Sequence, residues 1–234
     1  LFRSVAVIET PSLQSDFTMD GCLLDGNRTR GLQVLGSISR VTGSVIRNSS
    51  PLETDLTEGD GVYVAGHVIY ADTGLVGRDA RLDLQGSVLD NNSDAALVAL
   101  DASVSMRSTV VHGTRSTSEG TFGDGIISLW NADVTVEQCV LDSNARAGAS
   151  VFGASASVLD TLITCNAIDV DQEILETGQY GYTGPTVEPN IENTGGNVCM
   201  CGDEVHPCRA VSEHLEPPTP VKPIEPYQPP SSTP

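Results

Sequence analysis

A short pattern of small, aliphatic and polar positions recurs along this chain. Each copy has a small residue, then two aliphatic residues, and a mostly Asn, Ser or Thr position at its sixth place: CLLDGN, SVIRNS, SVLDNN, TVVHGT, CVLDSN and TLITCN. The copies begin at Cys22, Ser44, Ser87, Thr109, Cys139 and Thr161, and three of the five steps between them are 22 residues long. The other steps, of 43 and 30 residues, are longer by insertions. Such a period predicts a solenoid, in which one structural unit stacks on copies of itself.

The repeat unit predicts short β-strands. A further apolar residue lies three positions before each small residue, and a second apolar run, led by Gly or Ala, opens most units at residues 31, 61, 96, 125 and 148. These runs are short, β-branched and bounded by glycine, which is typical of strands. Helical periodicity is missing from the repeats. We therefore predict an all-β fold with about two strands per unit, a parallel β-helix of about six to seven coils.

The sixth position of the repeat predicts an internal polar ladder. Parallel coils hydrogen-bond at about 4.8 Å, so equivalent residues stack on one another. We expect the side chains of this inward column to bond the coils above and below: Asn27, Ser49, Asn92, Thr114, Asn144 and Asn166. The first aliphatic column either turns inward at a bend or forms an outward apolar stripe that needs a cover. That column consists of Leu23, Val45, Val88, Val110, Val140 and Leu162.

These stacked units, over about residues 15–170, resemble the right-handed parallel β-helix repeats of the pectin-lyase-like superfamily and of many bacterial surface proteins. The resemblance implies a right-handed solenoid and is specific for fold rather than activity. A leucine-rich repeat is the alternative, since Val136, Leu141 and Asn144 match its spacing. The small residue in the middle of every copy and the lack of a helical return segment favour the β-helix.

Three regions are expected along the chain. Residues 1–170 form the parallel β-helix, with residues 1–14 as an N-terminal strand or partial coil. Residues 171–215 lose the repeat, carry a cysteine cluster and form a C-terminal cap, because an uncovered last coil would present unpaired strand edges. Residues 216–234 contain eight prolines and form an extended linker or tail.

The six cysteines fall into two groups. Cys22 and Cys139 occupy the small column and are interpreted as buried small side chains. Four others lie near the predicted cap and allow two disulfides with three possible pairings: Cys165, Cys199, Cys201 and Cys208. The alternative is a zinc site built from Cys199, Cys201, His206 and Cys208. Its spacing is unusual for zinc, so we favour the disulfides.

Two insertions leave the same corner of the solenoid and predict a groove. The connections at residues 49–61 and 114–125 are long, whereas the one between them, at residues 92–96, is short. A degenerate coil at residues 67–70 would separate the two loops further. The predicted groove is acidic: Glu53, Asp55, Glu58, Asp60, Asp94, Glu119 and Asp124. Such carboxylates bind Ca²⁺ or act as an acid–base pair, and the alternative is that they are solvated loop residues.

The composition of the chain argues against several classes of partner and indicates where the protein acts. A net charge of −19 argues against nucleic acid and anionic membranes as partners. The sequence lacks a run of 18 apolar residues, so we expect no membrane insertion. The chain starts at Leu1, which is compatible with the removal or omission of a signal peptide. A secreted or cell-surface location fits the acidity and the cysteines, and the resemblance implies a bacterial source.

The resemblance also supplies a test for catalysis, which this chain does not meet. Polygalacturonase-like members use N-x-D, D-D, G-H-G and R-x-K, but here His112 follows Val111, an Asp-Asp pair is missing, and the one lysine is Lys222 in the tail. Pectate-lyase-like members use Ca²⁺ with an Arg or Lys base, and Arg107 and Arg115 lie near the second loop.

We accordingly assign no catalytic residue. We expect a non-enzymatic β-helix module of an exported protein, for adhesion or carbohydrate contact, with a polysaccharide or cell-surface glycan as partner. The alternative is a polysaccharide lyase or glycoside hydrolase that acts through the acidic groove. Apart from Ca²⁺ in that groove, no cofactor is expected.

Overall fold

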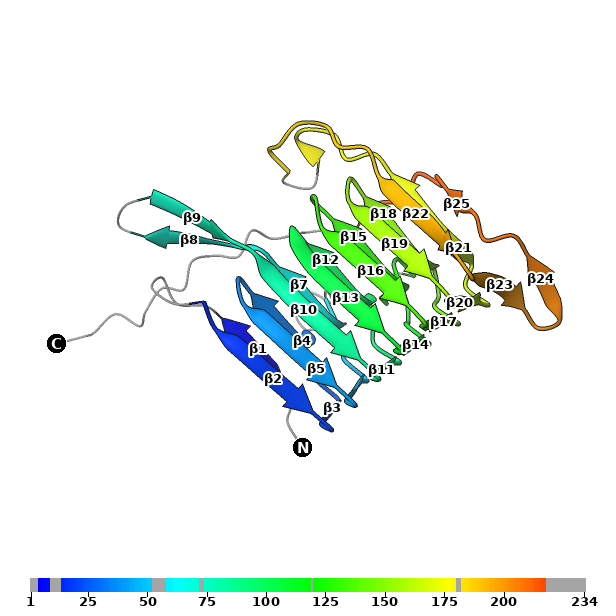
Figure 1. Cartoon of the computed structure of the whole chain (residues 1–234), viewed down its shortest axis with the longest axis horizontal. Coiled ribbons are helices and arrows are strands. Elements are labelled where there is room, and N and C mark those ends of the chain that lie inside the picture. Colours follow the sequence, from blue (N-terminus) through cyan, green and yellow to red (C-terminus); the bar gives the residue numbers. More distant parts are fainter. Residues whose placement is uncertain are drawn as a thin grey trace.

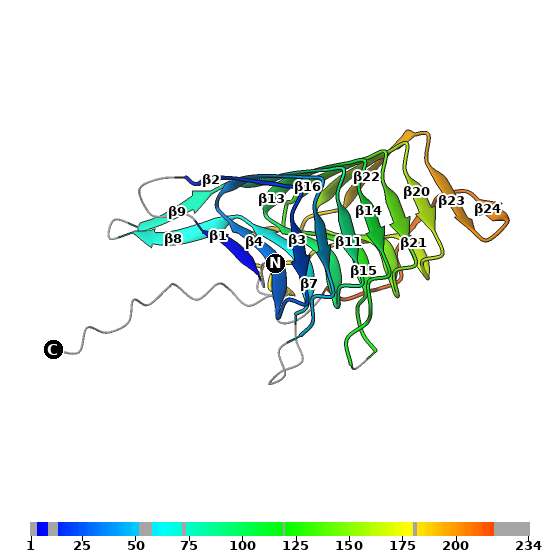
Figure 2. The same cartoon turned by 90° about the horizontal axis from the view of Figure 1, so that it is seen from below.

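The computed structural model describes residues 4–8, 14–51, 58–71, 74–118, 120–179 and 182–217. Within these ranges the chain is all-β and contains no α-helix. Its strands form three long sheets that run side by side along one axis and enclose a common core (Figures 1 and 2). The chain visits the three sheets in the same order in each turn, from β1, β2 and β3 to β21, β22 and β23. The fold is therefore a parallel β-helix-like solenoid.

We number the sheets 1 to 3. Sheet 1 contains, in spatial order, β1 (Val5–Ile8), β4 (Arg30–Leu35), β7 (Asp60–Ala65), β12 (Ala95–Leu100), β15 (Asp124–Leu129), β18 (Ala147–Phe152), β21 (Ile168–Glu173) and β25 (Ala210–Val211). Sheet 2 contains β2 (Asp16–Asp20), β5 (Ile38–Thr42), β10 (Ala80–Gln85), β13 (Ala102–Arg107), β16 (Asp133–Glu137), β19 (Ser155–Leu159) and β22 (Asn190–Gly195). Sheet 3 contains β3 (Leu23–Asp25), β6 (Val45–Arg47), β11 (Val88–Asp90), β14 (Val110–His112), β17 (Val140–Asp142), β20 (Leu162–Thr164), β23 (Val198–Cys201) and β24 (Glu204–His206).

Each turn has three strands, and the prediction of two strands per unit was wrong. The strand that sequence reasoning missed lies in sheet 2, where small polar residues alternate with apolar ones. In β13, for example, Ala102, Val104 and Met106 are buried while Ser103 and Arg107 are exposed. That alternation is typical of a strand with one face on the core and one in water.

Equivalent residues of successive coils stack in register, as the repeat predicted. Val88 of β11 pairs with Val45 of β6 and with Val110 of β14, all in parallel. The second aliphatic column of the repeat is buried in the core: Leu24, Ile46, Leu89, Val111, Leu141 and Ile163. The first column is half-buried and points outward from sheet 3. The chain does not bend there, so the outward apolar stripe is the correct alternative.

A second apolar cluster lies on the outer side of sheet 1. In β12, Leu97 and Ala99 belong to the central core, whereas Val98 and Leu100 belong to this outer cluster. The described side chains that cover it come from the C-terminal third of the chain, among them Leu175 and Tyr182. Because sheet 1 is covered on both faces, its strands read as continuous apolar runs.

The 43-residue step holds a hairpin, and the degenerate coil at residues 67–70 is not formed. β8 (His67–Ala71) pairs antiparallel with β9 (Gly74–Arg78). This hairpin projects from the stack beside β7 and β10 (Figure 1). β7 and β12 are direct neighbours in sheet 1, so the insertion does not widen the spacing of the coils.

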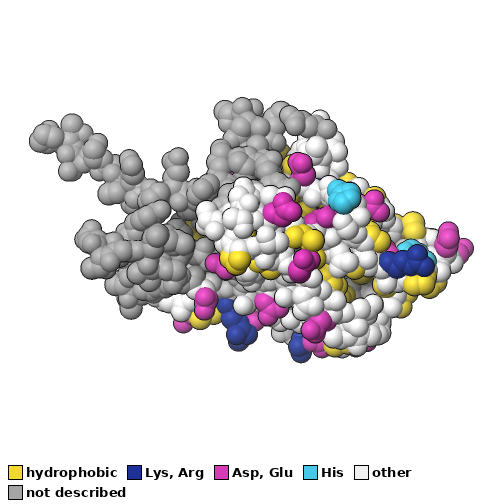
Figure 3. Space-filling model, turned by 90° about the horizontal axis from the view of Figure 1, so that it is seen from above, with side chains coloured by type: hydrophobic (Ala, Val, Ile, Leu, Met, Phe, Trp, Pro, Cys, Tyr) yellow, Lys and Arg dark blue, Asp and Glu magenta, His cyan; other side chains and the backbone are white. Residues whose placement is uncertain are grey.

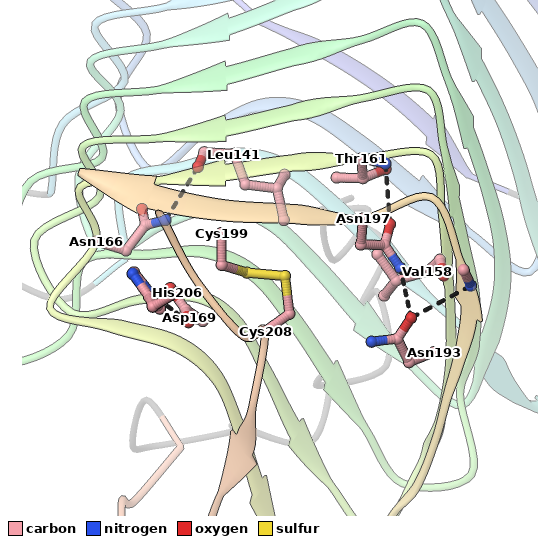
Figure 4. Close-up of a disulfide and its surroundings, with 11 residues drawn as sticks. Leu141, Val158, Thr161, Asn166, Asp169, Asn193, Asn197, Cys199, His206 and Cys208 are labelled. Atoms are coloured by element: carbon pink, nitrogen blue, oxygen red, sulfur yellow. Dashed lines mark hydrogen bonds and ion pairs between the residues drawn. A yellow bond between two sulfur atoms is a disulfide. The ribbon is translucent and has the colours of Figure 1, made fainter. Parts of the chain in front are cut away.

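Two disulfides secure the C-terminal end of the solenoid. Cys165 is bonded to Cys201, and Cys199 to Cys208. The second bond lies inside the ring of the chain, between the Asn166 and Asn197 sides of the coil (Figure 4). The zinc alternative fails, because its three cysteines are consumed in these bonds.

The other two cysteines are free: Cys22 is half-buried and Cys139 is buried. Within the described residues, no helix is long and apolar enough to cross a membrane.

Candidate functional site

The predicted polar ladder lies inside the solenoid, and its amides bond mainly to the backbone of the preceding coil. Asn92 is fully buried; its Oδ1 accepts from the Ser49 N–H at 3.1 Å, and its Nδ2 donates to the Ile46 carbonyl at 3.1 Å. Asn144 and Asn166 likewise accept from the backbone N–H one coil earlier, at 3.2 and 2.9 Å. The prediction of amides that bond one another holds for Asn144 and Asn166, which are 2.9 Å apart.

Glycine makes room for each long ladder side chain. A Cβ on Gly61 would lie 2.7 Å from the Asn92 Nδ2 atom, and a Cβ on Gly125 would lie 2.9 Å from that of Asn144. The coil between them carries Ala96, and its ladder residue is the shorter Thr114. The hydroxyl of Thr114 makes no hydrogen bond. The Gly–Asn and Ala–Thr combinations are therefore two ways of filling the same space.

A second polar ladder, which sequence reasoning missed, runs through the small column. The hydroxyl oxygen of Ser44 accepts from the Cys22 N–H at 3.1 Å, and that of Ser87 accepts from the Ser44 N–H at 3.2 Å. Thr161 accepts from the Cys139 N–H in the same way, at 3.3 Å. Each hydroxyl also donates to the carbonyl two residues earlier. The frequent Ser and Thr in this column are the signal that could have revealed it.

Four of the seven predicted groove residues lie in the described part of the chain, and they meet at one corner of sheet 1. Glu58 and Asp60 end the first long loop, Asp94 lies on the short connection, and Asp124 ends the second long loop. The backbone joins these segments: the Asp94 carbonyl accepts from the N–H groups of Gly123 and Asp124, at 2.8 and 3.1 Å. Glu53, Asp55 and Glu119 lie outside the described residues.

Two arginines that the sequence prediction did not include, Arg30 and Arg146, form ion pairs with carboxyl groups of this corner. Arg30 pairs with Glu58 at 3.0 Å and with Asp60 at 3.6 Å. Arg146 donates from Nε and Nη2 to both carboxylate oxygens of Asp124, at 2.5 to 3.0 Å. Both arginines lie at the same corner as their partners because Arg30 pairs with Asp60 in the strand register and Arg146 directly precedes β18.

The three aspartates are buried and Glu58 is half-buried, so the predicted open acidic groove is not lined by these aspartates. Asp60, Asp94 and Asp124 are 3%, 5% and 0% exposed. Burial raises the pKa of all three. The pKa of Asp94 reaches about 7, since the negative charge of Asp124 adds to the effect of burial and outweighs the opposing charge of Arg146. Asp60 and Asp124 are the first residues of β7 and β15, and Asp94 directly precedes β12.

Within the described part of the chain, no group of three or more His, Cys, Asp or Glu side chains has the geometry to bind a metal ion. The Oδ1 atoms of Asp60 and Asp94 are buried and make no hydrogen bond. His112, by contrast, is half exposed on sheet 3, with its Nδ1 2.8 Å from Asp90 and its Nε2 3.8 Å from Asp142.

A hollow of about 480 Å³ opens on the outer face of sheet 2. It spans β5, β10 and β13 and is lined mainly by polar side chains: Arg40, Thr42, Asp83, Gln85, Ser105 and Arg107, with Leu84 beneath. Arg40 and Arg107 are 67% and 53% exposed, and the side chains of Gln85 and Ser105 make no hydrogen bond within the described structure. Arg40 pairs with Asp83 at 3.6 Å and Arg107 pairs with Glu137, so the free groups that this face offers to a ligand are the Gln85 amide and the Ser105 hydroxyl.

A larger hollow, of about 600 Å³, lies on the outer side of sheet 1. Its lining includes Phe152, Leu215 and His214 together with Glu173, Glu176, Glu188 and Glu216. Acidic side chains are spread over the face shown in Figure 3. The surface seen there is consistent with the net charge of −19.

Fold and sites together define a parallel β-helix-like solenoid with internal polar ladders and a disulfide-bonded C-terminal end. No family model matches the chain, and no curated protein matches it. Among solved structures, it is similar to full-length QnrB1, a plasmid-mediated fluoroquinolone resistance protein, at 12% identity over 80% of this chain and 94% of that one, with a TM-score of 0.16. A trypsin-treated form of QnrB1 matches at 14% identity over 72% and 81% of the two chains, with a TM-score of 0.13. Scores this low support no inference about function.

Proposed function

We propose that this chain is a non-enzymatic module of an exported cell-surface protein and that it contacts a glycan through the outer face of sheet 2. The observation that carries the proposal is the hollow across β5, β10 and β13. Its guanidinium, amide, hydroxyl and carboxylate groups are the donors and acceptors that match the hydroxyl groups of a sugar.

The shape of sheet 2 supports an elongated ligand. Its strands are parallel and lie about 4.8 Å apart, so polar groups recur at a fixed interval along the axis of the stack. Outward columns such as Arg40, Asp83 and Ser105 follow that axis. A linear polymer that lies along this face would meet one set of polar groups per coil.

The arrangement of carboxyl groups supports binding without turnover. Glycoside hydrolases commonly use two carboxyl groups about 5–10 Å apart on either side of the scissile bond. Asp83 is the single carboxyl group among the described residues that line the sheet 2 hollow, and the neighbouring Glu137 and Asp20 are bonded to Arg107 and Thr42. The three aspartates of the sheet 1 corner are buried, and Asp60 and Asp124 are also paired with arginines.

A lyase or hydrolase is the second candidate, and the raised pKa of Asp94, about 7, is the observation that favours it, because a general acid or base works best near neutral pH. That function requires substrate to reach a side chain that is 5% exposed. The buried position of Asp94 is the reason that we rank catalysis second.

The finer features of the fold belong to the same proposal. We infer a right-handed β-helix of about six to seven coils, similar to pectin-lyase-like repeats, with residues 171–215 as its cap. The disulfides Cys165–Cys201 and Cys199–Cys208 support both the cap and an exported location, since such bonds persist in oxidising compartments.

Binding of the purified chain to a panel of neutral, acidic and amino polysaccharides tests the function. We expect retention on at least one of them without release of new chain ends, and a loss of at least about tenfold in affinity for the double variant Arg40→Ala/Gln85→Ala. The matched control is His112→Ala, a half-exposed polar residue of sheet 3 away from this face, which should bind as the parent does. Turnover of any polysaccharide, or equal binding by the parent and the double variant, would contradict the proposal.

A further inference from the structure

Five charged side chains form a line along the stacking axis at the corner of sheet 1. They follow the order Arg30, Asp60, Asp94, Asp124 and Arg146, one from each successive coil. Arg30 and Asp60 pair in the strand register, whereas Asp94 and Arg146 lie one residue before β12 and β18, and the register partner of Asp124 is Ala95. Backbone hydrogen bonds connect the neighbours: Ser93 N donates to the Gly59 carbonyl, Asp124 N to the Asp94 carbonyl, and Arg146 N to the Gly123 carbonyl, each at 3.1 Å. The line therefore contains three buried carboxyl groups between two guanidinium groups.

The charges of this line do not balance if every carboxyl group is ionised. Arg146 is committed to Asp124, and Arg30 is shared between Glu58 and Asp60. Asp94, in the middle, has no ion pair among the described residues, and its Oδ1 is buried without a hydrogen bond. An ionised, unpaired carboxylate in such a position costs several kcal/mol, and a protein avoids that cost by keeping the group neutral.

The middle of the line is also the place where both long loops are anchored. The first loop returns to sheet 1 through Glu58, Gly59 and Asp60, and the second through Phe122, Gly123 and Asp124. The segment Ser93–Asp94 bonds to both returns, through the Ser93 N–H on one side and the Asp94 carbonyl on the other. We call the residues through which each loop returns to sheet 1 the base of that loop. Repulsion at Asp94 would therefore act on the bases of both loops.

We propose that Asp60 and Asp94 hold a proton between them and act as a pH-operated latch on the bases of the two long loops. With the proton bound, the line carries no net charge beyond that of Glu58, and both bases are held. When the proton is lost, Asp94 repels Asp60 on one side and Asp124 on the other, and the bases loosen. This device is independent of the glycan contact proposed for sheet 2.

The groups that face the latch set the pH range. Burial raises the pKa of Asp60; Asp94 and Glu58 raise it further, and Arg30 lowers it. Burial also raises the pKa of Asp94; Asp124 and Glu58 raise it further, and Arg146 and Arg30 lower it. Tyr63, whose ring lies 3.7 Å under the Arg30 guanidinium, is buried and has a pKa raised to about 12, so it stays neutral. The latch therefore opens as the pH rises through about 7, the value that Asp94 reaches.

Amide hydrogen exchange of the whole chain at about pH 5 and about pH 8.5, corrected for intrinsic exchange rates, tests the latch. The reporters are the N–H groups of Gly59, Ser93 and Gly123, which bond within the corner. We expect their protection to fall by up to about tenfold per pH unit in the titration range, while amides of β13 and β16 keep theirs. In Asp94→Asn the corner amides should stay protected at both pH values, and the control Asp133→Asn, an exposed position, should behave as the parent.

Three results would overturn the proposal. One is equal protection of the parent at both pH values, and another is a pH response in Asp94→Asn that matches the parent. The third is restored protection at about pH 8.5 when CaCl₂ replaces EDTA, since a metal ion rather than a proton would then complete the site. A carboxyl-carbon NMR titration of the unmutated chain gives an answer even if the variant fails to fold: Asp94 must titrate near neutral pH.

Discussion

Replacement of Asn92 by alanine should destabilise the solenoid far more than the same replacement at Asn27. Both residues belong to the ladder column and both are 0% exposed. Asn92 satisfies the Ser49 N–H and the Ile46 carbonyl, each at 3.1 Å, whereas the amide of Asn27 makes no hydrogen bond to the protein. The comparison therefore separates the hydrogen bonds of the ladder from the volume of its side chain.

The expected magnitude follows from the groups left without partners. Each buried donor or acceptor that loses its partner costs about 1–3 kcal/mol, so the loss of two partners in Asn92→Ala should lower the free energy of unfolding by about 2–6 kcal/mol. Asn27→Ala removes an amide whose polar atoms are already unsatisfied. Its cost should be limited to the lost packing, about 1 kcal/mol or less, because the buried amide was itself unfavourable.

A double-mutant cycle with Gly61 tests how the ladder is accommodated. Gly61→Ala alone should cost about 1–3 kcal/mol, because the new Cβ would lie 2.7 Å from the Asn92 Nδ2 atom and 2.6 Å from the Ala96 carbonyl oxygen. Asn92→Thr alone loses the two hydrogen bonds. The double variant recreates the combination of Ala96 and Thr114 found in the next coil, so its cost should be smaller than the sum by about 1 kcal/mol or more.

Urea denaturation followed by circular dichroism, with an unchanged m-value as the check on two-state behaviour, gives all five free energies. The reasoning is refuted if Asn27→Ala and Asn92→Ala cost the same, since the hydrogen bonds would then contribute nothing. It is equally refuted if the Gly61 and Asn92 changes are additive, since the glycine would then not be making room for the amide.

Three further predictions concern other contacts. Replacing both Cys199 and Cys208 by serine should lower stability by about 2–3 kcal/mol in thermal melts. The bond joins two cysteines with a sequence separation of 9, and closing such a loop restricts the unfolded chain by about that amount. Arg146→Met should cost about 3–5 kcal/mol in urea titrations at neutral pH, because it leaves Asp124 buried without its partner, and less at acidic pH, where a neutral Asp124 needs no counter-charge. His112→Ala should change stability by no more than about 0.5 kcal/mol in the same titrations, since its contacts are half exposed.

The sequence was informative about the stacking of coils because the repeat keeps its period. Equivalent positions such as Val45, Val88 and Val110 are paired in the structure, and the Asn column is buried. Hydrophobic pattern and register are linked in a parallel sheet, since a one-residue slip would turn every core residue outward. The number of strands per turn was missed because sheet 2 alternates small polar and apolar residues, a weaker signal than a continuous apolar run.

The buried charges were misjudged for a different reason. Asp60 and Asp124 lie in Gly-Asp-Gly strings, which look like solvated turns when they are considered alone. Their partners are distant in sequence but lie on the adjacent coil. Asp124 and Arg146 are 22 residues apart, and Arg30 pairs with Asp60 across neighbouring strands. Comparison of charges at the repeat period, in addition to apolar positions, would have brought the opposite charges together.

The polar ladders give the solenoid a direction, and this direction explains why its two ends differ. In the small and Asn columns alike, a side chain of one coil accepts from the backbone N–H of the coil before it, as Ser44 does from Cys22 and Asn166 from Asn144. The last repeat therefore needs an acceptor from beyond the repeats, and Asn197 supplies it by accepting from the Thr161 N–H at 2.9 Å. At the other end, the ladder side chain Asn27 has no described coil before it and makes no hydrogen bond. The C-terminal end is thus completed by Asn197 and the two disulfides, whereas at the N-terminal end the Asn27 amide is buried without a hydrogen-bond partner in the described structure.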